Sequence, residues 1–99
     1  MALLLSSSQA PAQQMGQPGQ GLILARQVCG QCHAVEKGSP VSPDGAAPRF
    51  EDIANTPGVT STALGAALHT SHRTMPNLML ENNDVSNIVA YILSLKRVN

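Results

Sequence analysis

Large aromatic side chains are nearly absent from this sequence, because Phe50 and Tyr91 are the only two and Trp is missing. At 99 residues the chain is one domain at most, with a core near the lower limit for unaided folding. Small domains that lack large core side chains are stabilised by disulfides, by a metal or by a bound cofactor. Only Cys29 and Cys32 are cysteines, and we expect something besides side-chain packing to hold the chain together.

An excess of charge and a long apolar run are absent too. Six Lys and Arg balance six Asp and Glu, which leaves neither a basic field for nucleic acid nor an acidic solvating tail. No stretch approaches the ~20 apolar residues that span a bilayer. We therefore expect no nucleic-acid partner and no transmembrane segment, and a monomer whose partner choice rests on local surface patches.

The first 20 residues differ in composition from the rest. A short apolar run is followed by Ser8-Gln9-Ala10, a small-x-small pattern like a secretory cleavage site. A signal-peptide remnant that begins upstream of Met1 and a disordered tail both explain this start. Residues 9–21 are rich in Gln, Gly, Pro and Ala, which favours a flexible lead-in. We assign 1–20 to a flexible N-terminal segment and 21–99 to one domain.

Apolar residues recur at helical spacing over 21–33 and again over 61–69, where Thr60 or Ser61 is the expected cap. Prolines and glycines between these stretches make 37–48 an irregular loop. The sequence therefore predicts two helices separated by a long loop.

The clearest periodicity runs from Val85 to Leu93, with Asn82 or Asn83 as the expected cap. A further short helical turn is expected at 50–55, and no strand-like alternation is present. The predicted architecture is all-α, with three to four helices and long irregular loops.

The segment from Cys29 to His33 reads Cys-Gly-Gln-Cys-His, the attachment pattern for c-type haem. Two thiols separated by two residues at a helix end lie close enough to add to the two vinyl groups of one porphyrin. The next residue, His33, then falls beneath the iron and becomes its proximal ligand.

Other chemistry fits these residues less well. A zinc site would need further Cys or His at ligand spacing, and only His69 and His72 remain. A redox dithiol would need a βαβ context, and a structural disulfide between residues three apart would constrain almost nothing. We therefore expect one haem c, bound covalently by Cys29 and Cys32.

A closed electron-transfer centre needs a second axial ligand, and a methionine sulfur beside histidine favours the reduced iron. Met1 and Met15 lie in the flexible segment, which leaves Met75 and Met79. Met75 precedes Pro76 in a loop between two expected helices, whereas Met79 lies in an apolar run, where core filling is the usual role. We expect Met75 to be the ligand, with Met79 as the alternative.

Taken together, these features resemble a class I c-type cytochrome, in particular the short bacterial periplasmic members with one haem. The resemblance covers Gly21 to Leu95 and rests on Cys29 to His33, Met75-Pro76 and Ala90-Tyr91-Ile92. The interval from Met75 to Tyr91 is similar to that of the family, and the interval from Met79 is not. The resemblance implies a cytochrome c-like fold wrapped around one covalently attached haem.

The same resemblance implies roles for three further residues. Gly21 corresponds to the small residue at the crossing of the first and last helices, and Tyr91 to an aromatic there. Pro48 corresponds to the proline whose carbonyl accepts the other N–H of the proximal histidine and raises its basicity. Ala25 departs from the family, in which many members carry an aromatic at the crossing.

Partners for the haem propionates stay open, since no Trp is present. Arg49 and Arg73 are candidates, and a solvated surface charge is the alternative for each. His69 and His72 are expected to be surface or helix-end residues rather than ligands of a bis-histidine haem.

If protein fills both axial positions, small molecules find no open site on the iron. We therefore expect a soluble electron carrier, not an enzyme, that meets redox donors and acceptors transiently. Bacterial members of the family receive their thioether bonds in exported chains, which predicts the periplasm. Two alternatives stay open: an open-site haem protein that binds or senses a gas or reduces peroxide, and a cytochrome subunit of a larger redox enzyme.

Overall fold

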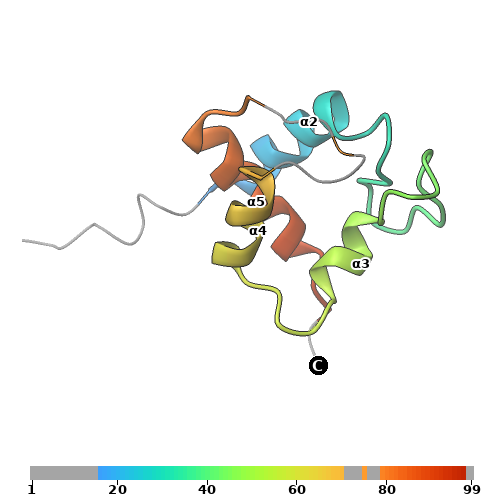
Figure 1. Ribbon diagram of the computed structural model, residues 1–99. Coiled ribbons are helices and arrows are strands. Elements are labelled where there is room, and N and C mark those ends of the chain that lie inside the picture. The colour runs from blue at the N-terminus through green and yellow to red at the C-terminus, as the bar shows by residue number, and fades with distance from the viewer. Residues whose placement is uncertain (1–15, 71–74, 76–78, 98–99) are drawn as a thin grey trace, which may run out of the picture.

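The computed structural model of the chain describes residues 16–70, 75 and 79–97, and within these ranges it contains four α-helices and no strand. The helices are α2 (Pro18–Val28), α3 (Phe50–Ala54), α4 (Ser61–Leu68) and α5 (Asn82–Ser94). A long irregular loop joins α2 to α3 (Figure 1). The all-α class predicted from the sequence is confirmed, and most of the predicted N-terminal segment lies outside the described residues.

Helix α2 begins earlier and ends earlier than the periodicity predicts. It begins at Pro18, because proline is tolerated in the first turn, where its missing N–H has no helical partner to lose. It ends at Val28, and the backbone N–H groups of Cys29 and Gly30 both donate to the carbonyl of Ala25. The Cys-x-x-Cys-His segment therefore follows the helix as a turn.

The N-terminal ends of α4 and α5 are built differently. The hydroxyl of Thr60 accepts a 3.1 Å hydrogen bond from the backbone N–H of Ala63, which confirms the predicted cap of α4. At α5 the cap position belongs to Glu81, whose backbone is extended, while Asn82 and Asn83 already lie inside the helix. The prediction of an asparagine cap was wrong, and no side chain caps this end.

Helix α5 packs against α2, α3 and α4, and its most extensive packing is with α2 (Figure 1). A Cβ atom built on Gly21 would lie 1.9 Å from the carbonyl oxygen of Asn87 and 2.9 Å from the Cβ of Tyr91. Only glycine lets the two backbones approach this far. The crossing expected at Gly21 and Tyr91 is confirmed.

The core lies between these helices and uses both aromatic residues. Ile88 is fully buried, and Phe50 and Tyr91 are buried with ring centroids 6.4 Å apart. The Tyr91 hydroxyl donates to the carbonyl of Val35, so α5 is bonded to the segment that follows His33. None of the helices in the described ranges has the length and apolar character needed to span a bilayer.

Candidate haem site

The segment from Cys29 to His33 is a compact turn at the C-terminal end of α2. Cys29 is the C-cap residue, and its carbonyl accepts hydrogen bonds from the backbone N–H groups of Cys32 at 3.1 Å and His33 at 2.9 Å. Cys29 is buried, whereas Cys32 and His33 are half-buried. Both thiols are free, so each sulfur is available for a covalent bond to a cofactor.

A backbone carbonyl holds the ring of His33. Its Nδ1 lies 2.6 Å from the carbonyl oxygen of Pro48, fifteen residues further along the chain. A carbonyl only accepts, so Nδ1 carries a proton, and Nε2 is the ring nitrogen left to bind a metal. The ring of Phe50 packs beside the imidazole, with centroids 5.3 Å apart. His33 therefore has the tautomer and the support of a metal-ligating histidine.

The loop that carries Pro48 is joined to the Cys29–His33 turn by backbone bonds. Phe50 N donates to the carbonyl of Ala34 at 2.9 Å, and Asp44 N donates to the carbonyl of Cys32 at 3.0 Å. The hydroxyl of the buried Ser42 accepts from Ala34 N at 2.9 Å. These bonds bring Pro48 to His33, and local sequence patterns do not indicate any of them.

The environment of Cys29 differs from that of a redox dithiol. Burial raises the pKa of the Cys29 thiol to about 11. Reactive dithiols have a lowered pKa, because the thiolate is the nucleophile. Among the described residues, no group of three or more His, Cys, Asp and Glu is arranged to hold a metal ion, so the zinc alternative gains no support either.

The two candidate methionines differ in exposure. Met75 is half-buried, whereas the side chain of Met79 is 94% exposed. The apolar run around Met79 suggested core filling as its alternative role, and this exposure contradicts that reading. Residues 71–74 and 76–78, which flank Met75, lie outside the described residues, and axial ligation by Met75 stays a prediction.

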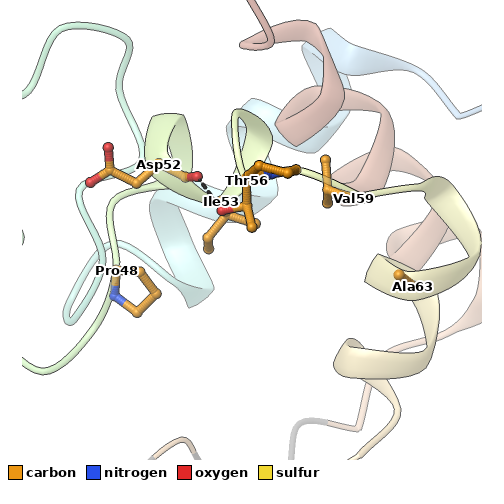
Figure 2. A pocket seen from close by; sticks show the side chains of 8 residues that line it. Pro48, Asp52, Ile53, Thr56, Val59 and Ala63 are labelled. Atoms are coloured by element: carbon orange, nitrogen blue, oxygen red, sulfur yellow. Dashed lines mark hydrogen bonds between the residues drawn. The ribbon is translucent and has the colours of Figure 1, made fainter.

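A cavity of about 370 Å³ lies beside Pro48 (Figure 2). One side of α3, the connection from α3 to α4 and the start of α4 line it, with side chains that are mostly apolar: Pro48, Asp52, Ile53, Thr56, Pro57, Gly58, Val59 and Ala63. The hydroxyl of Thr56 turns back to donate to the carbonyl of Asp52 at 2.7 Å. An apolar wall with few polar groups suits a porphyrin. Of these lining residues, the sequence predicted only Pro48 as part of a site.

Arg49, at the end of the loop, is paired with Asp52 of α3. The guanidinium of Arg49 donates to both carboxylate oxygens of Asp52, at 2.8 and 2.9 Å, and to the carbonyl of Ser39 at 2.9 Å. The hydrogen bond from Arg49 holds the pKa of the Asp52 carboxyl below its usual value. Arg49 is thus bound to protein groups on both sides, and its role as a propionate partner stays a prediction.

Three other predicted residues have different outcomes. His69 is the exposed C-cap residue of α4, in agreement with its expected place at a helix end. His72 and the second candidate propionate partner, Arg73, lie outside the described residues.

Comparison with known proteins identifies one family. The family model described as Cytochrome c matches residues 16–96, which is more than half of the chain. No curated protein and no solved structure matches the chain. The matched range includes the Cys29–His33 turn, Pro48, Met75 and all four helices.

Proposed function

Since the chain belongs to the cytochrome c family, which carries electrons on covalently attached haem c, we propose that it holds its haem through Cys29 and Cys32, with His33 and Met75 as the two axial ligands. The bound iron would supply the ferrous–ferric couple. With both axial positions occupied by protein, the proposed function is electron transfer between other redox proteins, not catalysis on a small molecule.

The bond between His33 Nδ1 and the Pro48 carbonyl is the observation that carries this proposal. It supports a ring with a proton on Nδ1, which leaves Nε2 as the nitrogen that would bind a metal, and it raises the basicity of the ring toward that metal. The free thiols fit a cofactor attached at this turn, and the largely apolar cavity meets the turn through Pro48, the residue that bonds His33.

The choice of Met75 over Met79 rests on the resemblance to the family. Met75 precedes Pro76 and stands at the family's interval from Tyr91, whereas Met79 does neither. We expect the ferric protein to show the weak far-red band of thioether ligation. Met75→Ala should abolish the band, and the control Met79→Leu should keep it. Retention of the band in Met75→Ala would refute ligation by Met75.

Covalent attachment is tested by the mass of the intact native protein. A mass increment of one haem that survives denaturation is expected for the wild type and should be lost when Cys29 and Cys32 are both replaced by Ser. A colourless wild type, purified after expression with a cytochrome c maturation system, would overturn the haem proposal itself.

We further propose a periplasmic location and transient partners. Thioether bonds are formed in exported chains in the bacterial members of the family, which supports export. The balanced net charge of the sequence predicts that association with partners depends only mildly on salt overall. Fractionation of the source cells tests the location, and co-purification of a stable partner would instead indicate a subunit of a larger enzyme.

A further inference from the structure

Arg49 lies next to Pro48 and is the most fully bonded cation of the loop. Its guanidinium uses three of its nitrogen atoms, two on the Asp52 carboxylate and one on the carbonyl of Ser39. The two ends of this arrangement belong to different parts of the chain, since Asp52 is in α3 and Ser39 is in the loop. Arg49 therefore ties the loop to the helix.

A second bond ties the same part of the loop to α3. The carboxylate of Glu51 accepts a hydrogen bond from the backbone N–H of Gly38. Gly38 has φ +84°, a conformation that glycine adopts without strain. The side chains of Glu51 and Arg49 thus bind residues 38 and 39. This part of the loop is held against the start of α3, where Pro48 leads into the helix.

The peptide group between Pro48 and Arg49 links the side-chain bonds of Arg49 to His33. A peptide group is planar, so the Pro48 carbonyl and the N–Cα bond of Arg49 lie in one plane. The carbonyl therefore changes direction whenever this plane rotates. Arg49 has an extended backbone, with φ −67° and ψ 146°, and its side chain is anchored on both sides. Rotation of that peptide would move the carbonyl away from the 2.6 Å contact with Nδ1 of His33.

We propose that Arg49 is a positioning residue of the haem site: by binding Ser39 and Asp52, it holds the Pro48 carbonyl in line with Nδ1 of His33. The inference rests on the proposed ligation of the haem iron by His33. It gives Arg49 a role in setting the reduction potential, because the carbonyl bond makes the imidazole a stronger donor, which favours ferric iron.

A direct ion pair between Arg49 and a haem propionate is the competing explanation, and Arg49→Lys separates the two. Lysine keeps the charge but loses the planar fork that binds Asp52 and Ser39 together. If Arg49 positions the carbonyl, the equilibrium constant for reduction by a reference couple should rise about threefold to tenfold, the size expected for loss of one hydrogen bond. At 59 mV per tenfold, this is an increase of about 30 to 60 mV. A charge that merely faces a propionate predicts little change.

A second readout follows the bond itself. In the reduced protein, the His33 Nδ1–H proton should exchange with solvent about threefold to tenfold faster in Arg49→Lys than in the wild type, as measured by NMR. Arg26→Lys is the matched control, because Arg26 also forms a two-pronged ion pair, with Glu36, but does not contact the turn at Pro48. The control should change neither the potential nor the exchange rate.

Asp52→Asn removes the carboxylate that Arg49 binds. This variant tests the role of Arg49 if Arg49→Lys does not acquire covalent haem. It should also speed exchange of the His33 ring proton. Unchanged exchange in both variants, with haem attached and His33 bound, would overturn the role of Arg49 and leave the proposed function intact. A wild type without covalent haem, or with haem not ligated by His33, would instead overturn the proposed function.

Discussion

The crossing of α2 and α5 predicts a large loss of stability when Gly21 is replaced by Ala. The new Cβ would lie 1.9 Å from the carbonyl oxygen of Asn87, where ordinary contacts begin at 3.4 Å, so the backbones must separate by roughly 1.5 Å. Overpacking of this kind costs about 3 kcal/mol. Alanine recovers about 1 kcal/mol through its higher helix propensity. The net loss should be about 2 kcal/mol, which lowers Tm by about 8–16 °C in a domain of this size.

Gly19 supplies a matched control in the same helix. A Cβ at Gly19 would meet nothing within 4 Å, so Gly19→Ala should leave the stability unchanged or raise it by up to about 0.5 kcal/mol. Urea unfolding of both holo-protein variants, followed by far-UV circular dichroism, gives the two free energies of unfolding. Equal stabilities of the Gly21→Ala and Gly19→Ala variants would contradict the close crossing and with it the packing of α2 on α5.

Two further predictions concern the Tyr91–Val35 hydrogen bond and the Arg26–Glu36 ion pair. Tyr91→Phe removes the hydrogen bond from the Tyr91 hydroxyl to the buried carbonyl of Val35 and should lower the free energy of unfolding by about 1–2 kcal/mol; an unchanged value in urea unfolding would show that this bond adds nothing. The hydrogen bond from Arg26 lowers the pKa of Glu36 below its ordinary value of 4.5, so the ion pair stabilises the fold above about pH 4.5 and loses this effect as the pH falls through the lower folded-state pKa. The stability difference between wild type and Glu36→Gln, measured by urea unfolding, should therefore shrink from about pH 6 to about pH 3; a difference that stays constant over this range would exclude a contribution from the ion pair.

The helices show which structural features can be predicted from local sequence and which cannot. The spacing of apolar residues from Val85 to Leu93 predicts α5, because this spacing by itself identifies an amphipathic helix. The cap of that helix was mispredicted, because whether Asn82 or Glu81 leaves the helical conformation depends on how the preceding chain approaches. The early start of α2 at Pro18 was missed, because the surrounding Gln, Gly and Pro suggest a flexible segment.

The family of the protein could be recognised from the sequence alone, because Cys29, Cys32 and His33 are close neighbours whose spacing identifies the Cys-x-x-Cys-His motif. The tertiary structure decided what supports them. It contains the bond from His33 Nδ1 to the Pro48 carbonyl that the family resemblance implied, and it alone showed the pairing of Arg49 with Asp52 and Ser39 and the cavity wall at residues 56–59. Each of these contacts joins groups whose approach depends on the folded path of a loop, and no spacing along the chain specifies that path.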